Sequence, residues 1–228
     1  VLINYADVLR TNGKYEEAIK IYTQYLDSVP GDKRALNGIE SCKVTPQWES
    51  TPTRFKVSVE QPINSRYADF GPSYAGSLGN KIIFTSTRDD ATGKRKSAIT
   101  GQRFADLYVT NFDVQKQRWD KPVRIDDQSV VNTNEEEGAP SVTSNGATLY
   151  FTRSAYSKTE PSAPQIYTAR FSQGIWSEPT LLSIVPDSIM AAHPSISSDG
   201  FSLFFVSDME GGHGGKDIWR VDQQDGEW

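Results

Sequence analysis

The sequence has a single cysteine, Cys42, among 228 residues, and it has no long apolar run. One cysteine cannot form a disulfide within the chain, and it leaves the redox compartment open. No stretch of about 18 apolar residues occurs, so the sequence predicts no membrane-spanning helix. Basic residues are also in the minority: 24 Lys and Arg stand against 29 Asp and Glu, a net charge of −5. This charge argues against a nucleic-acid-binding protein, which would normally have a basic face.

Glycine, proline and aromatic residues, in contrast, are well represented. The chain has 17 Gly and 12 Pro, and 11% of its residues are aromatic. This composition is typical of a globular protein rich in strands and turns. The length allows one large domain, or one medium and one small domain. The chain begins at Val1, without Met, so we expect any signal peptide or lipid-anchor cysteine to lie upstream.

The first 44 residues have the apolar spacing of helices. Apolar residues recur every three or four positions, and Asn12-Gly13 and Pro30-Gly31 interrupt the pattern. These breaks predict three helices, the third from Asp32 to Cys42. We therefore expect a helical segment over residues 1–44 and a linker over residues 45–66.

The second of these helices resembles the tetratricopeptide repeat. The stretch NGKYEEAIKIYTQYLDSVPGD has that family's spacing at Gly13, Tyr15, Ala18, Tyr22 and Pro30. It departs from the family where Tyr25 replaces a small residue and Leu2 replaces Trp. One repeat and a capping helix cannot bury a full core, so the resemblance implies further repeats before Val1. Such a segment is either a peptide-binding groove or a spacer packed on its neighbours.

Three later segments repeat one pattern of Pro-Ser, a turn containing Gly, an alternating apolar strand, and Ser or Thr. They are FGPSYAGSLGNKIIFTSTRD, EGAPSVTSNGATLYFTRS and AAHPSISSDGFSLFFVSD. Each is followed by a second match, ADLYVTNF, PQIYTARF or KDIWRVDQ, and then by a Trp after a polar turn. We expect this Trp to anchor each unit against its neighbour.

Four short strands in roughly 40 to 60 residues are the signature of a β-propeller blade. We therefore expect an α+β, multidomain chain in which the helical segment precedes an all-β propeller of four-stranded blades over residues 67–228. The three blades are expected at 67–125, 135–184 and 191–228. Propellers typically need four to eight blades to close, so we expect these to be part of a larger propeller.

The segment MEGGHGGK looks at first like a phosphate-binding loop. A P-loop needs Gly-Lys-Ser/Thr and then a helix, whereas here a strand follows and Asp217 would repel a phosphate. The segment stands where RDDATGKRKSAITGQRFA and SAYSKTEPSAP stand in the other units. We interpret it as the connection between the second and third strands of a blade.

The motifs VNTNEEEGAPSVTSNGATLYFTRS and GGHGGKDIWRV, with the W-x-x-P of Trp119–Pro122 and Trp176–Pro179, resemble the WD40-like repeat of TolB-type propellers. With the preceding helical segment, the chain resembles a family of Bacteroidota envelope proteins. In that family a tetratricopeptide segment precedes such a propeller, and an OmpA-like peptidoglycan-binding domain ends the chain. One branch of the family is a periplasmic lipoprotein of the type IX secretion system.

Polar residues recur before each Pro-Ser pair in the first two units. Asn64 and Asn132 stand eight residues before the Pro, and Asp69 and Glu137 stand three before it. The third unit departs from this pattern. There the polar pair Asp187-Ser188 is one residue closer to the Pro, and Ala191 replaces the acidic residue.

The sequence GPSYA around Ser73 approaches a nucleophile elbow, which requires a strand-to-helix turn. Ser73 matches Ser141 and Ser195, however, and a residue repeated in every unit is a structural serine rather than a nucleophile. The two histidines, His193 and His213, occupy non-equivalent positions of one unit, where a general base is conceivable but not favoured.

Four potential metal ligands are clustered in the third unit. Asp208, Glu210, His213 and Asp217 lie within ten residues, but the spacing fits neither transition metals nor calcium well. The simpler interpretation is a solvated turn in which Asp217 bonds to backbone amides. The acidic run of residues 135–137 is likewise most simply a solvated loop. We assign no catalytic, cofactor-binding or metal-binding residue.

These observations favour a non-enzymatic scaffold. The resemblance implies a periplasmic, outer-membrane-associated protein, with a lipoprotein anchor upstream, that links outer-membrane or type IX secretion machinery to the envelope. Contacts would use blade loops and the helical groove, and a domain outside this segment would bind peptidoglycan. A second hypothesis is a propeller that binds a glycan or peptide in its central channel, with aromatic residues such as Tyr156 and Trp219 stacking on sugars. A third is the non-catalytic propeller of a hydrolase. No cofactor or nucleic acid is expected.

Overall fold

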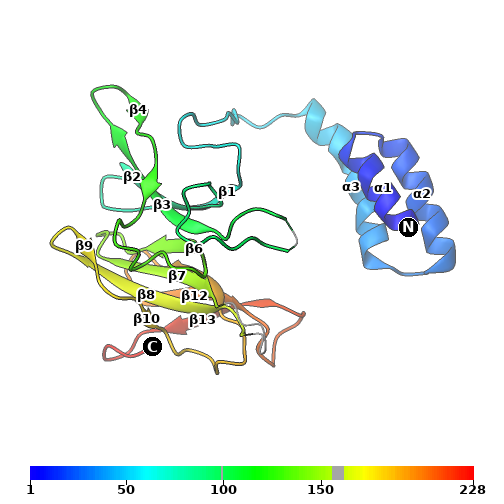
Figure 1. Ribbon diagram of the computed structural model, residues 1–228. Coiled ribbons are helices and arrows are strands. Elements are labelled where there is room, and N and C mark those ends of the chain that lie inside the picture. Colours follow the sequence, from blue (N-terminus) through cyan, green and yellow to red (C-terminus); the bar gives the residue numbers. More distant parts are fainter. Residues whose placement is uncertain (99, 156–161) are drawn as a thin grey trace. The chain divides into compact units, whose positions relative to one another are not determined.

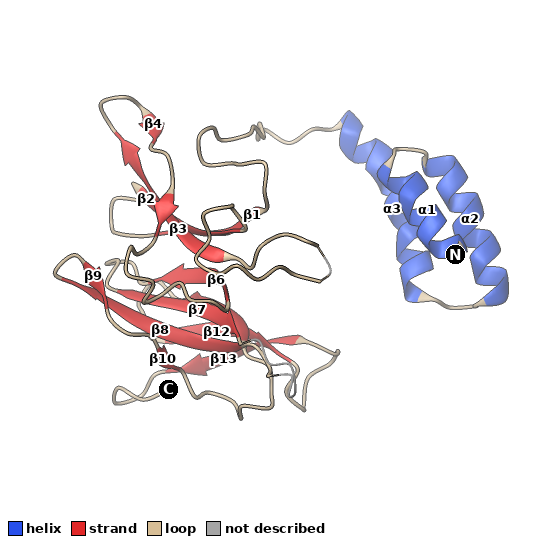
Figure 2. Cartoon of the chain, in the orientation of Figure 1, coloured by secondary structure: helices blue, strands red, loops and turns tan. Residues whose placement is uncertain are grey.

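The structure is a computed structural model that describes residues 1–98, 100–155 and 162–228. It divides into two compact units, Val1–Ser58 and Val59–Trp228. Figure 2 shows helices in the first unit and strands in the second. No helix in the described ranges is both long and apolar enough to cross a membrane.

The first unit contains the three predicted helices, α1 (Leu2–Thr11), α2 (Tyr15–Ser28) and α3 (Lys33–Ser50). Gly13 and Gly31 lie in the two turns with φ of 75° and 81°, a backbone conformation that glycine adopts without strain. Asp32 caps α3 by accepting a hydrogen bond from the Ala35 amide at 2.9 Å. The turn residues of the sequence therefore end and start the helices as expected.

The prediction that the third helix ends at Cys42 is wrong, because α3 continues to Ser50 and includes Pro46. The proline lacks an N–H and so removes one hydrogen bond from the helix without ending it. Hydrogen bonds continue on both sides: the Thr45 hydroxyl donates to the Ser41 carbonyl at 2.7 Å, and the amide of residue 51 donates to the carbonyl of residue 47 at 3.1 Å. Residues 45–50 are therefore helix rather than linker.

The helical core forms around Tyr22, which is fully buried. The other buried members of this cluster are Ala6, Leu9, Ala18, Ala35 and Cys42. The Tyr22 ring lies against Gly38 of α3, where an added Cβ would come within 2.4 Å of Cζ. Its hydroxyl donates to the carboxylate of Asp7 in α1. Tyr22 thus joins all three helices.

The second unit consists of three antiparallel sheets in which neighbouring strands are mostly consecutive in the sequence (Figure 1). The first has β1 (Asp69–Tyr74), β2 (Lys81–Ser86), β3 (Asp106–Asp113), β4 (Arg118–Trp119) and β5 (Val123–Arg124). The second has β6 (Glu136–Val142), β7 (Thr148–Ser154), β8 (Gln165–Ser172), β9 (Ile175–Trp176) and β10 (Thr180–Leu181). The third has β11 (Ala192–Ile196), β12 (Ser202–Ser207) and β13 (Asp217–Asp222).

The predicted fourth strand of each unit is short and interrupted. In the first sheet, β4 and β5 both pair with β3 on the edge opposite β2. Pro122 stands between them, and a proline cannot donate a ladder hydrogen bond. Pro179 stands in the same way between β9 and β10 of the second sheet. In the third sheet, the described residues after β13 form only an isolated bridge between Gln224 and Glu227.

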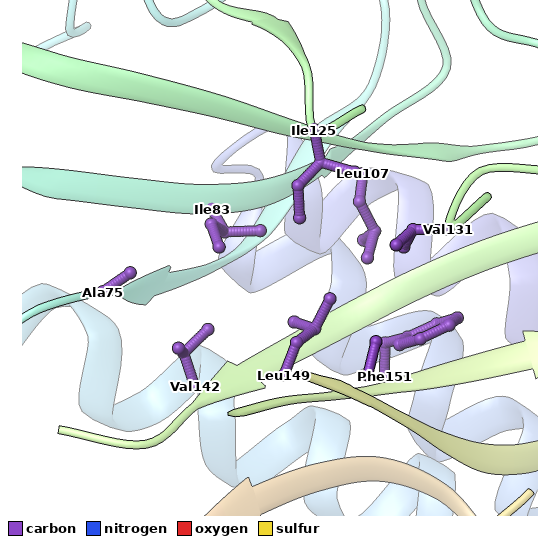
Figure 3. Packing of buried hydrophobic residues seen from close by; sticks show 9 residues of the cluster. Ala75, Ile83, Leu107, Ile125, Val131, Val142, Leu149 and Phe151 are labelled. Atoms are coloured by element: carbon purple, nitrogen blue, oxygen red, sulfur yellow. The ribbon is translucent and has the colours of Figure 1, made fainter. Parts of the chain in front are cut away.

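Apolar side chains join the first and second sheets. Figure 3 shows Ile83 and Leu107 of the first sheet pointing toward Leu149 and Phe151 of the second. Trp176 packs against the same cluster, which confirms that this tryptophan anchors its sheet on a neighbour. A second cluster joins the second and third sheets through Tyr150, Ile166, Leu203 and Phe205, with Trp219 and Trp228 packed against it. The middle sheet is therefore covered on both faces.

The outer face of the third sheet is uncovered in the described residues. Ile218 pairs with Val206 in the same register in which Leu107 pairs with Thr85 and Ile166 pairs with Thr152. Leu107 and Ile166 are 0% exposed, whereas Ile218 is 78% exposed. The expectation of further blades stays a prediction.

Candidate functional site on the inner strands

The first strand of each sheet has a β-bulge at its Pro-Ser pair. The pairing shifts between Phe70 and Ser73, between Gly138 and Ser141, and between Ala192 and Ser195. The residue before each proline has a positive φ: 59° at Gly71, 49° at Ala139 and 54° at His193. Bulges re-aim the strand and are common beside functional sites.

The three serines occupy one register position, as predicted. Ser73 pairs with Ile83, Ser141 with Tyr150 and Ser195 with Phe204. The Ser141 hydroxyl accepts a hydrogen bond from the Ile196 amide of the next sheet at 3.0 Å. This serine therefore has a structural contact between sheets.

The bulges are also the points at which adjacent sheets are hydrogen-bonded. The Ala139 amide donates to the Thr85 hydroxyl of the first sheet at 2.9 Å. The His193 amide donates to Thr152, the equivalent residue of the second sheet, at 2.8 Å. The repeated contact holds the three inner strands, β1, β6 and β11, in a fixed arrangement.

The acidic run at residues 135–137 contains a member of a buried ion pair. The prediction of a solvated loop there is therefore wrong. Glu136 and Glu137 belong to β6, and Glu137 is 0% exposed. Glu137 accepts hydrogen bonds from Arg153 Nε at 2.9 Å and from the Thr133 hydroxyl at 2.6 Å. Arg153 also donates to the Val131 carbonyl at 2.9 Å. The guanidinium thereby compensates the buried carboxylate.

Two aromatic rings complete the environment of Arg153. Its Cζ lies 5.3 Å from the Phe151 ring centroid and 4.7 Å from that of Tyr167. These distances are within the range of cation–π attraction. We call the set of acid, arginine and two rings the acid–arginine clamp.

The first sheet has the same clamp built from different positions. Asp69, equivalent to Glu137, accepts from the Ser65 hydroxyl at 2.7 Å and pairs with Arg88 Nη2 at 3.1 Å. Arg88 also donates to the Ile63 carbonyl and lies 5.3 Å from the ring centroids of both Phe84 and Tyr108. The arginine stands four residues after the strand phenylalanine here and two after it in the second sheet. This offset hides the correspondence in the sequence.

The third sheet lacks both members of the clamp. Ala191 takes the place of the acid and is fully buried, and Ser207 stands where Arg153 would be. Met209 packs in the apolar cluster, and Asp208 instead accepts a hydrogen bond from the Met190 amide at 2.9 Å. Loss of the acid and loss of the arginine therefore go together.

Burial and hydrogen bonding act in opposite directions on the two clamp acids. Desolvation tends to raise the pKa of Asp69, but hydrogen bonds from Ser86 and Ser65 and the charge of Arg88 outweigh it, and the pKa is lowered. Burial dominates at Glu137 and raises its pKa, although Thr133 and Arg153 oppose this.

Asn64 and Asn132 form hydrogen bonds with the backbone, Asn64 locally and Asn132 with a strand of the first sheet. Asn132 is fully buried; it accepts from the Leu107 amide at 2.8 Å and donates to the Leu107 carbonyl at 3.0 Å. Asn64 accepts from the Glu60 amide at 3.1 Å. Asp187 of the third unit accepts from the Gln165 side chain at 3.3 Å through its carbonyl.

The glycine-rich segment connects β12 to β13, as predicted. Asp217 accepts a hydrogen bond from the Gly214 amide at 2.9 Å, which confirms the expected turn contact. Within the described ranges no group of three His, Cys, Asp or Glu residues is placed to hold a metal ion. Trp219 pairs with Phe205 in the register of Tyr108 and Tyr167 and is partly buried. Tyr156 lies outside the described residues.

An inner pocket of about 330 Å³ lies along the inner strands of the three sheets. Three residues that immediately precede a third strand contribute to its lining, one from each sheet: Ala105, Pro164 and Lys216. Phe70, Glu136, Met190 and His193 also line it. The sequence gives no signal for this pocket, because its lining residues are spread over positions 70 to 216. They come together only where the bulged inner strands lie beside one another.

No family model matches the chain, and no curated protein does. Solved structures with partial similarity include TolB from Acinetobacter baumannii, with 17% identity and a TM-score of 0.40 over 67% of this chain and 29% of that chain. A Mycobacterium tuberculosis puromycin-hydrolyzing peptidase has 16% identity and a TM-score of 0.44 over 71% and 22% of the two chains. An endo-arabinase from Bacteroides thetaiotaomicron VPI-5482 has 17% identity and a TM-score of 0.40 over 72% and 60%.

The chain therefore spans from about a fifth to three fifths of the length of these structures. Since they include TolB as well as hydrolases, the similarity does not decide whether the chain is an enzyme.

Proposed function

We propose that the chain is a non-enzymatic binding scaffold of the bacterial periplasm. Its partner binds the surface formed by the connections between the second and third strands of the sheets. The single observation that supports this best is that the described C-terminal ends of these connections lie close together beside the inner strands.

The convergence follows from two hydrogen bonds between sheets. The Ala105 carbonyl, at the end of the first connection, accepts from the Glu137 amide of the next inner strand at 2.9 Å. The Pro164 carbonyl, at the end of the second connection, accepts from the Ala191 amide at 2.9 Å. Ala105, Pro164 and Lys216 line one pocket, so the described C-terminal ends of the three connections lie close together, as loops on a rigid scaffold do in binding proteins.

The first connection presents positive charge on an acidic protein. Its backbone is ordered by a bridge between Lys96 and Arg103 and by the Ser97 amide, which donates to the Gln102 carbonyl at 2.9 Å. Lys94 and Lys96 are exposed, and Arg95 pairs with Glu135 at 3.2 Å. Two exposed lysines on a hydrogen-bonded loop favour a partner with an acidic surface.

We take this partner to be a protein of the envelope machinery, of the outer membrane or of the type IX secretion system, as the sequence resemblance implies. Peptidoglycan anchoring is proposed for a domain outside these residues. The alternative is a propeller that binds a glycan or peptide directly, or one that accompanies a hydrolase domain.

Crosslinking in intact envelopes followed by mass spectrometry tests the proposal. We expect outer-membrane or secretion components to be captured by the wild-type protein and to be lost with Lys94→Glu/Lys96→Glu. The matched control, Lys20→Glu/Lys121→Glu, changes the same charge at exposed lysines elsewhere. Equal capture by both double variants would contradict the role of this loop. Retention on glycan through the propeller alone would favour the alternative.

A further inference from the structure

We propose that the inner pocket binds a primary-amine cation, such as a lysine side chain of a peptide, with Glu136 as its counter-ion. The pocket is separate from the exposed lysines of the first connection, so the inference does not depend on the proposed function.

Glu136 is a partly buried carboxylate with no hydrogen-bond or ion-pair partner among the described residues. It is adjacent to Glu137 on β6, and both residues line the pocket. Glu137 is held in its clamp by Arg153, whereas Glu136 has no such partner in the described ranges. Desolvation by burial raises its pKa.

A half-buried carboxylate without a partner is costly for the free protein. An incoming ammonium group would form a charge-assisted hydrogen bond with it and remove much of that cost. The lower desolvation cost of the Glu136 carboxylate in the occupied pocket is the physical basis for the affinity.

An apolar part of the lining fits the hydrocarbon stem of a lysine. Phe70, Met190, Ala192 and Val206 contribute apolar surface to the pocket. A volume of about 330 Å³ is at the lower end of the range for ligand pockets, about 300–1,000 Å³, and suits one side chain better than a large ligand.

At this position of the three inner strands, only the second sheet has an acid. The equivalent residues three positions before Gly71 and His193 are Ala68 and Met190. Lys216 also lines the pocket but forms no ion pair within the described part of the chain. Its positive charge opposes a cationic ligand, and this makes a second variant informative.

The test uses the whole chain of 228 residues, isotope-labelled for NMR, and two peptides. Acetyl-Gly-Lys-Gly-amide supplies the ammonium group, and acetyl-Gly-norleucine-Gly-amide supplies the same stem without it. We expect the lysine peptide to shift the amide signals of Phe70, Glu136 and Met190 and to bind at least about tenfold more tightly than the norleucine peptide.

Three variants separate specific binding from weak, unspecific attraction. Glu136→Gln should weaken binding of the lysine peptide about tenfold, whereas Glu178→Gln, at an exposed acid outside the pocket, should leave it unchanged. Lys216→Gln should strengthen it several-fold, so the proposal stays testable even if Glu136→Gln does not fold. Equal affinity for the two peptides, or equal loss with Glu136→Gln and Glu178→Gln, would overturn the proposal. Neither result would bear on Lys94 and Lys96.

Discussion

The acid–arginine clamp of the second sheet gives the sharpest stability prediction. In Glu137→Ala, the Arg153 guanidinium stays in a largely buried site without its carboxylate. In Arg153→Met, the carboxylate of Glu137, 0% exposed in the wild type, loses its cation. Removing one member of a buried ion pair costs about 3–5 kcal/mol. We expect each single variant to lose stability of this order.

The double variant Glu137→Ala/Arg153→Met should lose much less than the sum of the two. It removes both charges together and leaves an apolar side chain beside the rings of Phe151 and Tyr167, much as the third sheet has Ala191 and a nearby Met209. Residues in direct contact typically couple by about 0.5–3 kcal/mol. We expect a coupling in the upper part of that range.

Urea unfolding followed by tryptophan fluorescence measures the cycle, because Trp119, Trp176, Trp219 and Trp228 all lie in the unit that contains the clamp. The same cycle at the exposed pair Arg220 and Asp222, 2.8 Å apart, is the control and should couple by less than about 1 kcal/mol. Additive single losses at Glu137 and Arg153 would refute the clamp as a stabilising unit.

Three smaller predictions follow from other contacts. Gly38→Ala should destabilise the helical unit by about 1–3 kcal/mol, measured by thermal circular dichroism, because its Cβ would collide with the Tyr22 ring; no loss would show that the ring moves freely. Thr85→Val should cost about 1–3 kcal/mol in urea unfolding, since the Ala139 amide loses its acceptor between two sheets; a neutral result would mean that water replaces the hydroxyl. Because the pKa of Asp69 is lowered in the folded protein, its carboxylate stabilises the fold fully above about pH 5, and this stabilisation is lost as the pH falls below about 4. In Asp69→Asn the free energy of unfolding should therefore fall less steeply at acid pH. An unchanged pH profile of unfolding would contradict the role of Asp69.

The repeat of strands could be predicted from the sequence because each strand alternates and each turn contains Gly or Pro. Ser73, Ser141 and Ser195 fall in one register position for this reason. The end of α3 could not be predicted in the same way. Pro46 is an ordinary stop signal, but hydrogen bonds on either side of it continue the helix.

The sequence indicates the acids of the clamp but not their arginine partners. The recurring acids at Asp69 and Glu137 stood out, but their partners Arg88 and Arg153 occupy different offsets and meet the acids only through strand pairing. For the same reason Glu137 was expected to be solvated. A charged residue within a run of charges is expected to be exposed unless a distant partner of opposite charge is known.

The inner pocket depends still more on tertiary structure. Phe70, Glu136 and Lys216 belong to three sheets and come together only because the bulged inner strands lie beside one another. No spacing in the sequence encodes that distance. Its chemistry therefore had to be inferred from the assembled side chains.

The most direct test of the scaffold proposal is quantitative crosslinking of the wild-type protein and Lys94→Glu/Lys96→Glu in intact envelopes. The proposal predicts that identified outer-membrane or secretion proteins crosslink to residues of the strand connections in the wild type and are lost in the variant. An unchanged set of crosslinks in the variant, or crosslinks confined to surfaces away from these connections, would contradict it.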